Sequence, residues 1–280
     1  MRTLVHLSDL HFGRIDPQIL PPLLAAVHAA APDLVIVSGD FTQRAKVQEF
    51  KDAASFLAEL PQPQLLVPGN HDVPLYNVLR RWLTPLDRYR RYITHDLAPI
   101  HVDAEIAVLG INTARALTFK GGRINQVQLD AIAERLAMCG PDATRIIVTH
   151  HPFDTLPDTL LGHNSVGRAH LAIPALLQSR VDMILSGHLH LSRVGGTAER
   201  YPMHGRNALL IQAGTATSTR QRGEVNAFNI LRIARPQVDV TSMVWDPDGM
   251  AFRQGSVELF RETAAGWARH EARDAGATPQ

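Results

Sequence analysis

The sequence predicts an α/β protein built of layered strands and helices, and three observations support this fold class. Short apolar runs alternate along the chain with longer helix-like stretches, which is the element order of layered α/β folds. Some of these runs, such as residues 34–37, are apolar at every position, as expected for parallel strands buried on both faces. The chain has 280 residues, of which 45% are hydrophobic and 20% charged, so it can bury a large core and is not disordered.

The first part of the chain alternates strands with helices. Each of three apolar runs is followed by polar residues and then by a helix-like stretch. The expected strands are residues 3–7, 33–39 and 64–69, and the helices after them are residues 18–30, 47–60 and 75–83.

In the middle of the chain, two helix-like stretches each precede a further strand. The expected helices are residues 127–138 and 171–180, and the strands are residues 145–150 and 181–188. In the first of these helices, Leu129, Ile132 and Leu136 recur at helical spacing.

The last third of the chain has a different character. Strand-like runs at residues 208–214, 226–234, 237–245 and 256–262 are separated by Gly, Pro and Asp, which indicates antiparallel strands joined by turns. From Gly266 onward the apolar pattern is lost. We therefore expect one domain over residues 1–265 and a frayed tail over residues 266–280.

Composition excludes several classes of protein. The net charge of +1 gives no global attraction to nucleic acid or anionic lipid, although it leaves room for a local basic patch. A single cysteine, Cys139, excludes a disulfide framework and a cysteine-based zinc site. The apolar run near the N-terminus is too short for a signal peptide, and no run approaches the roughly 20 apolar residues that span a bilayer. A cytoplasmic protein without a membrane span is expected.

Carboxylate, imidazole and amide side chains cluster directly after the expected strands. In open α/β sheets, ligands bind beyond the carboxyl ends of the strands, so these clusters should converge on one place. They contain Asp9 and His11, then Asp40, then Asn70, His71 and Asp72, then His150 and His151, and finally His188 and His190.

The residue types in these clusters indicate a metal site. Asp9 and His11 are two residues apart, so in an extended segment both side chains would point the same way. Aspartate, imidazole and amide oxygen suit divalent manganese, iron, cobalt or zinc. The set is too large for one tetrahedral ion. Two ions that share a carboxylate fit better, and such pairs commonly hydrolyse phosphate esters.

Five blocks of this sequence resemble the shared motifs of the calcineurin-like metallophosphoesterase superfamily. The blocks are SDLH, SGD, GNHD, THHP and GHLH, in the family's order, between residues 8 and 190. The resemblance implies a four-layer α/β/β/α sandwich of two mixed sheets flanked by helices, with a dinuclear metal site at one edge. It also implies a role for each matching residue. Asp9, His11 and His190 would hold one metal, Asn70, His150 and His188 the other, and Asp40 would bridge the two.

The mechanism that the resemblance implies is in-line attack on phosphorus by a metal-bridging hydroxide. His71 resembles the family's substrate-side histidine, and Asp72 would orient the His71 ring. Neighbouring residues of a strand face opposite sides, so His150 and His151 should not both be ligands. As in similar proteins, the first of the two is assigned to the metal. His151 and His163 are further candidates for contact with substrate.

The block GDFTQRAKVQEF resembles the bacterial branch that contains class III cyclic nucleotide and glycerophosphodiester phosphodiesterases. The expected substrate is therefore a small-molecule phosphodiester, with a cyclic nucleotide such as cAMP first. A nuclease and a nucleotide-sugar or lipid pyrophosphatase are the alternatives, although a nucleic-acid partner is not expected. A non-catalytic scaffold is disfavoured because every ligand position is filled. A homodimer is left open.

Overall fold

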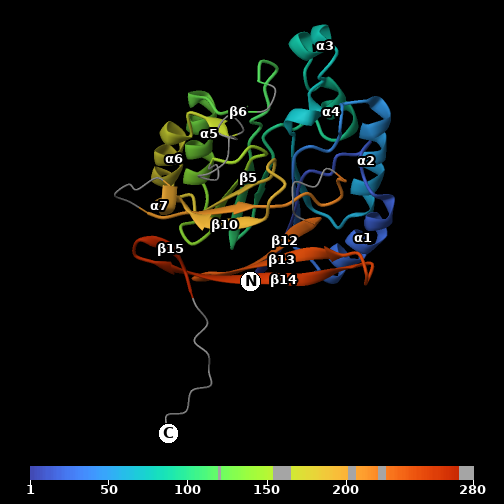
Figure 1. Ribbon diagram of the computed structural model, residues 1–280. Helices are drawn as coiled ribbons and strands as arrows, with labels where there is room; N and C mark the ends of the chain where they lie inside the picture. Colours follow the sequence, from blue (N-terminus) through green and yellow to red (C-terminus); the bar gives the residue numbers. More distant parts are fainter. Residues whose placement is uncertain (119–120, 154–164, 201–205, 220–224, 271–280) are drawn as a thin grey trace.

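The computed structural model describes residues 1–118, 121–153, 165–200, 206–219 and 225–270. Two mixed β-sheets face each other, and helices cover both outer faces, which gives four layers in the order α/β/β/α (Figure 1). The four-layer fold expected from the sequence is thereby confirmed. In the described part of the chain, no helix combines the length and apolar character needed to cross a bilayer.

The first sheet has seven strands in the order β15-β14-β13-β12-β1-β2-β3. Its strands are β1 (Arg2–Leu7), β2 (Leu34–Ser38), β3 (Gln64–Val67), β12 (Ala227–Ala234), β13 (Gln237–Asp246), β14 (Ala251–Thr263) and β15 (Gly266–Arg269). The first three are parallel, and the last four form antiparallel pairs. The helices of its outer face are α1 (Leu20–Ala29), preceded by the 3-10 turn η1 (Pro17–Ile19), α2 (Val47–Glu59) and α4 (Asp87–Tyr92).

The second sheet has six strands in the order β10-β11-β9-β7-β5-β4. Its strands are β4 (Ile100–Val102), β5 (Ile106–Gly110), β7 (Thr144–Val148), β9 (Met183–Ser186), β10 (Arg193–Gly196) and β11 (Leu209–Gln212). Its outer face is covered by α5 (Gln126–Ala137) and α6 (Ala169–Gln178). The remaining elements are the small pair β6 (Gly122–Arg123) and β8 (Val166–Gly167), the helices α3 (Val78–Leu83) and α7 (Thr197–Arg200), and the 3-10 turn η2 (Asn70–Asp72).

The alternation of side chains along each strand builds three layers of core. In β2, Leu34 and Ile36 pack in the core between the two sheets, whereas Val35 and Val37 pack against the helices outside. Both sets are buried, so the run is apolar throughout. The sequence pattern that predicted parallel strands therefore has this physical origin.

Two parts of the structure differ from the expected element order. The hairpin of β4 and β5 was not predicted, although β5 lies inside the second sheet beside β7. The helix expected at residues 75–83 is shorter, because Asn77 caps α3 by accepting a hydrogen bond from the amide of Arg80 at 2.9 Å. Helix α4 follows as a separate element, and β11 pairs in parallel with β9 although its region was expected to be antiparallel.

The frayed tail was expected to begin at Gly266, and this is wrong for residues 266–269. Gly266–Arg269 forms β15 at the edge of the first sheet, and the Trp267 side chain is fully buried in the core between the sheets. Trp267 Nε1 donates a hydrogen bond to Asp182 Oδ1 at 3.0 Å. One large side chain in a four-residue strand gives no periodicity, which is why the sequence pattern missed it. Residues 271–280 lie outside the described residues.

Candidate metal centre

The predicted ligands lie together where strands of both sheets end. β1, β2 and β3 of the first sheet and β7 and β9 of the second each lead into a loop that carries polar residues. Backbone hydrogen bonds join the first two loops, from Asp9 N to Gly39 O at 3.1 Å and from His11 N to Asp40 O at 2.8 Å. The convergence expected from strand ends is confirmed.

Asp9, His11 and His190 form the first group of donor atoms. The Nε2 atom of His190 lies 3.2 Å from Asp9 Oδ1 and 3.2 Å from His11 Nε2. The distance from His11 Nε2 to Asp9 Oδ1 is 3.5 Å. All three side chains are buried.

Asn70, His150 and His188 form the second group. His150 Nε2 lies 3.1 Å from Asn70 Oδ1 and 3.2 Å from His188 Nδ1. Asp40 stands between the two groups, because its Oδ2 atom lies 3.6 Å from His11 Nε2 and 3.3 Å from His150 Nε2. One carboxylate oxygen of Asp40 therefore faces both groups.

These donor atoms fit divalent cations. Asp9 Oδ1 is buried and makes no hydrogen bond, although two imidazole nitrogens lie within 3.5 Å of it. Imidazole nitrogens of His11 and His190 also face each other, and so do those of His150 and His188. Buried charges and close sets of acceptors are costly in a protein unless they are paired or coordinate a metal. The donor set of carboxylate, imidazole and amide oxygen matches divalent transition metals.

The electrostatics of the group keep both carboxyls ionised. Burial alone would raise the pKa values of Asp9 and Asp40, but the neighbouring histidines override it and hold both pKa values below the ordinary range. For His150, burial opposes the charged form, but the Asp40 carboxylate prevails and raises the pKa to about 9. A proton on His150 would therefore compete with a metal for Nε2, since a ligand imidazole must be neutral.

Five of the proposed ligands have strained backbone conformations. Positive φ angles occur at Asp9 (55°), His11 (50°), Asp40 (55°), His188 (74°) and His190 (59°). Asp9 and His11 therefore do not lie in the extended segment that the sequence analysis assumed. Non-glycine residues adopt this left-handed region at a cost of about 1–3 kcal/mol each, typically at functional sites. The conformation turns each loop tightly enough to direct both members of the D-x-H and H-x-H pairs inward.

Two glycines allow the loops to approach each other closely. A Cβ atom at Gly69 would lie 2.1 Å from Asp40 Oδ1, and a Cβ atom at Gly187 would lie 1.7 Å from Ser8 Oγ. Both separations are far shorter than any van der Waals contact. Glycine before Asn70 and before His188 is therefore a packing requirement of the site.

The expected contact between Asp72 and the His71 ring is absent, and this part of the prediction is wrong. The Asp72 carboxylate accepts hydrogen bonds from Gly69 N at 2.9 Å and from Thr42 N and Thr42 Oγ1 at 3.0 Å each. His71 Nδ1 instead donates to the backbone carbonyl of Gln43 at 2.8 Å. The two side chains diverge because they occupy successive positions of a 3-10 turn. Burial and then the Asp40 charge raise the pKa of Asp72 to about 7.

His151 lies much closer to the second group than strand alternation predicted. β7 ends at Val148, so residues 150 and 151 are not in extended backbone and their rings need not face opposite sides. Ring centroids of His151 lie 4.9 Å from His150 and 4.8 Å from His188. Its Nδ1 atom is bonded to Thr113 Oγ1 at 2.8 Å, and its buried Nε2 atom has no hydrogen bond. Burial, followed by the two neighbouring histidines, holds the His151 pKa well below its ordinary value.

Some residues of the site could not be found from the sequence. Gln43, Thr42 and Thr113 orient site residues through a backbone carbonyl or a hydroxyl, and such roles leave no motif. His163 lies outside the described residues.

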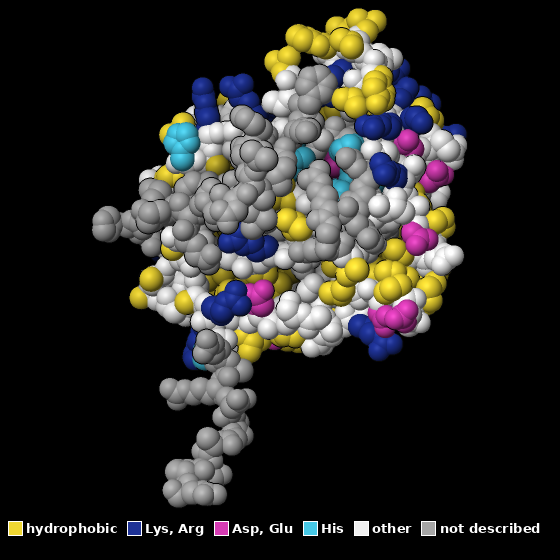
Figure 2. All heavy atoms as spheres, viewed as in Figure 1, with side chains coloured by type: hydrophobic (Ala, Val, Ile, Leu, Met, Phe, Trp, Pro, Cys, Tyr) yellow, Lys and Arg dark blue, Asp and Glu magenta, His cyan; other side chains and the backbone are white. Residues whose placement is uncertain are grey.

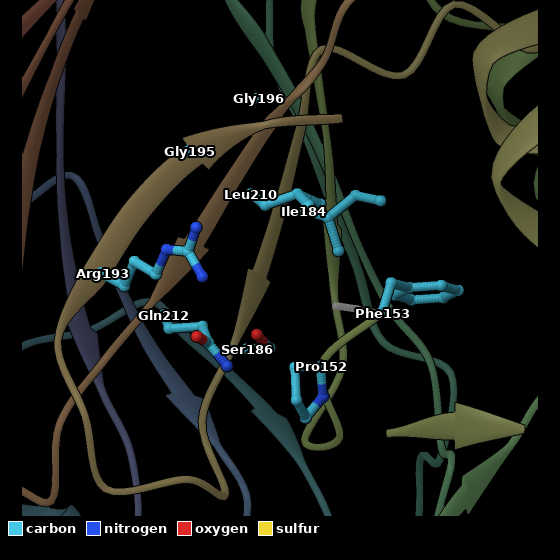
Figure 3. Close-up of a pocket in the computed structure, with 9 residues that line it drawn as sticks. All are labelled: Pro152, Phe153, Ile184, Ser186, Arg193, Gly195, Gly196, Leu210 and Gln212. Carbon is cyan, nitrogen blue, oxygen red and sulfur yellow. The ribbon is translucent and has the colours of Figure 1, made fainter. Parts of the chain in front are cut away.

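Two cavities lie next to the metal centre. The larger one, of about 680 Å³, includes Val73 and Ala114 in its wall, which directly follow Asp72 and Thr113. Its other walls come mainly from α3, α4 and the segment after them, and its volume suits a small molecule. The smaller one, of about 20 Å³, lies behind β9 and β11, with Arg193, Gln212 and Ser186 directed into it (Figure 3). Its volume corresponds to about one water molecule.

The fold and these residues define a metal-dependent hydrolase of phosphoric esters. The family model for calcineurin-like phosphoesterases matches residues 2–192, and the chain belongs to that family. A probable cyclic nucleotide phosphodiesterase of Synechococcus is 26% identical over 207 residues, which cover 69% of this chain and 75% of the relative. A probable cyclic nucleotide phosphodiesterase of Rhodococcus erythropolis is 28% identical over 213 residues, which cover 68% of this chain and 65% of the relative.

Solved structures agree with the fold. The purple acid phosphatase PPD1 of yellow lupin superposes with a TM-score of 0.66 at 10% sequence identity, over 87% of this chain and 51% of that one. At this identity the likeness supports the four-layer architecture alone.

Proposed function

We propose that the protein is a dinuclear metal-dependent phosphodiesterase that acts on a small-molecule phosphodiester, with a cyclic nucleotide as the leading candidate. The observation that carries this proposal is the position of Asp40. Its Oδ2 atom faces His11 in one group and His150 in the other, at 3.6 and 3.3 Å. A carboxylate shared in this way is what a pair of closely spaced ions requires.

The residues divide between two ions. Asp9, His11 and His190 would hold the first, Asn70, His150 and His188 the second, and Asp40 would bridge them. Two divalent ions supply a water of lowered pKa and neutralise charge on the phosphoryl oxygens. Manganese, iron, zinc and cobalt all suit this donor set.

Hydrogen bonds between side chains and the backbone keep the proposed ligands in place. The His71 amide donates to Asp40 Oδ1 at 2.8 Å, which leaves Oδ2 directed at the two groups. His150 Nδ1 is bonded to the carbonyl of Ser38 at 2.7 Å, so this nitrogen carries the proton and Nε2 faces the site. Asp72 caps the η2 turn through the amide of Gly69, and thereby positions Asn70 and His71. Asp72 is therefore a positioning residue.

His71 is the candidate that contacts the substrate. Its ring is half-buried and stands edge-on to the His11 ring, with 4.8 Å between the centroids. The Gln43 carbonyl accepts a hydrogen bond from Nδ1, which fixes a proton on that nitrogen. When His71 is protonated, Nε2 can donate to a phosphoryl oxygen or to the leaving oxygen.

The relatives support the choice of substrate. Two of them are named as probable cyclic nucleotide phosphodiesterases, and a third, from Mycobacterium tuberculosis, is named as a cAMP/cGMP dual specificity phosphodiesterase. A shorter match of 34% identity over 76 residues, to a UDP-2,3-diacylglucosamine pyrophosphatase of Chlamydia muridarum, favours a pyrophosphatase as the second candidate.

Hydrolysis of bis(p-nitrophenyl) phosphate with added Mn²⁺ tests the mechanism. Elemental mass spectrometry should find fewer metal ions bound to Asp40→Ala than to the wild type. Turnover should fall about 10³-fold or more, because both proposed ion positions depend on Asp40. His170→Ala, an exposed histidine on α6, is the matched control and should behave as wild type. Full activity of Asp40→Ala would overturn the dinuclear mechanism.

A substrate panel then separates the candidates. It should contain cAMP, cGMP, glycerophosphodiesters, nucleotide sugars and short single-stranded DNA. The proposal predicts the highest kcat/KM for a cyclic nucleotide, whereas preference for a nucleotide sugar would identify a pyrophosphatase.

A further inference from the structure

Helix α3 carries Arg81 inward and its apolar residues outward. The exposed fractions of Val78, Leu79, Trp82 and Leu83 are 63%, 72%, 63% and 71%, whereas that of Arg81 is 3%. A surface helix of a monomeric protein has the opposite arrangement, with its apolar face on the core. The folded chain therefore displays this face instead of burying it.

Specific hydrogen bonds hold α3 in this orientation. The Arg81 guanidinium donates to the carbonyls of Ala116 at 2.6 Å, Thr118 at 2.8 Å and Pro74 at 3.1 Å. Arg80 also pairs with Asp87 at the start of α4, at 2.6 Å. Since each bond runs from an arginine to a fixed partner, the outward position of the apolar side chains is built into the fold.

The apolar surface extends beyond the helix. Tyr76 is 77% exposed and Leu117 is 67% exposed. Leu117 lies between Ala116 and Thr118, whose carbonyls accept hydrogen bonds from Arg81. We call the six residues Tyr76, Val78, Leu79, Trp82, Leu83 and Leu117 the α3 patch. Figure 2 shows hydrophobic side chains gathered over α3 at the top of the molecule, with Lys and Arg side chains beside them. Exposed apolar residues gathered in this way mark interaction or membrane surfaces.

The surroundings of the α3 patch are basic. Apart from the buried Arg81, residues 74–97 contain four arginines and two aspartates, a charge of +2, although the whole chain carries only +1. Arg90 and Arg91 on α4 are exposed, and the Arg44 guanidinium lies over the Tyr76 ring, 5.5 Å from its centroid. Tryptophan, tyrosine and leucine next to arginines are the composition of segments that lie in a lipid–water interface.

We propose that the α3 patch docks the protein onto an anionic lipid surface. With six residues, about 9 Å in length, α3 can lie within the interface without crossing it. A second copy of the chain fits less well, because a two-fold interface would place two sets of +2 against each other. An anionic surface instead complements both the apolar residues and the arginines.

The docked orientation has a consequence for catalysis. Leu83 of the α3 patch also lines the cavity of about 680 Å³ that begins beside Asp72. A docked protein would thus hold this cavity near phosphodiesters carried by the surface. That consequence rests on the proposed function, whereas the docking itself does not.

Vesicle binding tests the docking independently of catalysis. The metal-loaded protein should co-sediment with phosphatidylcholine vesicles that contain phosphatidylglycerol, more weakly with phosphatidylcholine alone, and less at high salt. Trp245 and Trp267 are buried, so Trp82 is the one exposed tryptophan of the three in the chain. Its fluorescence should shift to shorter wavelength on binding, and Trp82→Phe should remove this shift.

Variants separate the two parts of the surface. The double variant Leu79→Glu and Trp82→Glu should weaken vesicle binding at least about tenfold while it still hydrolyses bis(p-nitrophenyl) phosphate. The double variant Arg90→Glu and Arg91→Glu should lose the preference for anionic lipid. Met138→Glu, at an 81% exposed position at the end of α5, is the matched control and should bind as wild type.

Three results would overturn the proposal. The first is wild-type protein that does not sediment with anionic vesicles. The second is equal binding by the wild type and the Leu79→Glu, Trp82→Glu variant. The third is a wild-type dimer in analytical ultracentrifugation that this variant converts to a monomer, without vesicle binding by either, which would assign the patch to a second copy of the chain.

Discussion

The metal centre and helix α3 depart from the usual distribution of side chains in opposite directions. At the metal centre, Asp9 and His150 are fully buried. The pKa of Asp9 is lowered and that of His150 is raised, so both side chains favour their charged forms. On α3, Leu79 and Trp82 are largely exposed although both are apolar. In each region the unfavourable placement is held by specific contacts from neighbouring loops. We infer that each region is completed by something outside the chain, a pair of cations in one case and a lipid surface in the other.

Two tryptophans give the sharpest test of this contrast. Trp267→Ala should lower the free energy of unfolding by about 3–5 kcal/mol, because its side chain is fully buried between the sheets. Trp82→Ala should change it by no more than about 0.5 kcal/mol, because the α3 patch contributes little to folding. Urea unfolding of both variants measures the difference. A large loss for Trp82→Ala would mean that α3 is a folding element, not a display surface.

His71 tests where the metal centre ends. His71→Ala should reduce turnover about 10²-fold through loss of a proton donor, while the metal content stays near that of wild type. Metal analysis and steady-state kinetics on the same preparation distinguish the two effects. Loss of metal together with activity would make His71 a ligand, and the His11, Asp40 and His71 donor atoms are close enough for that outcome to be informative.

Gly69 tests how tightly the centre is packed. Gly69→Ala places a Cβ atom 2.1 Å from Asp40 Oδ1, so it should destabilise the fold by about 1–3 kcal/mol and weaken metal binding. Gly140→Ala is the matched control, because a Cβ atom there meets nothing within 4 Å. Thermal unfolding with and without Mn²⁺ is the measurement. Equal stability of the two variants would show that the loops around Asp40 can move apart.

Glu262 provides a half-buried charge that the chain pairs by itself. Its carboxylate accepts two hydrogen bonds from Arg235, both at 2.6 Å, and these bonds lower the Glu262 pKa. A lowered pKa means that the pair stabilises the fold above the unfolded-state value, near 4.5, and that this stabilisation is lost as pH falls through the lower folded-state value.

The expected stability difference between wild type and Glu262→Gln is about 1–2 kcal/mol at neutral pH and should diminish below pH 4.5. Urea unfolding over a pH series measures it. Glu134→Gln, at an exposed position of α5, should show no such dependence. A difference for Glu262→Gln that persists unchanged in acid would mean that the contribution is packing and not charge.

The sequence was sufficient for features that depend on local order along the chain. Strands buried on both faces, such as β2, are apolar at each position, and ligands follow strand ends because both sheets open toward the same edge. This order along the chain is why the sequence predicts seven ligand positions, and the fold brings their side chains together.

Other features depend on contacts between distant segments, and these the sequence could not indicate. Asp72 was expected to orient His71 because the two are adjacent, but its carboxylate accepts hydrogen bonds from the amides of Thr42 and Gly69 instead. His151 was placed on the far side of a strand that ends before it, at Val148. The sequence also could not indicate that the apolar face of α3 is exposed. The spacing of apolar residues along a helix is the same whether that face or the Arg81 face packs against the rest of the protein.

The left-handed backbone at Asp9 and four other ligand positions has a consequence for how such a protein changes over generations. Replacing Asp9 by glycine would remove a proposed metal ligand, a buried charge and about 1–3 kcal/mol of backbone strain in a single step. This relief of strain is offset, because two buried donors, Ser8 Oγ and His188 N, would lose their hydrogen bonds to Asp9 Oδ2 at 2.6 and 2.8 Å. With the two terms of similar size, descendants that lose this carboxylate should keep the four-layer scaffold and be free to be recruited for binding alone.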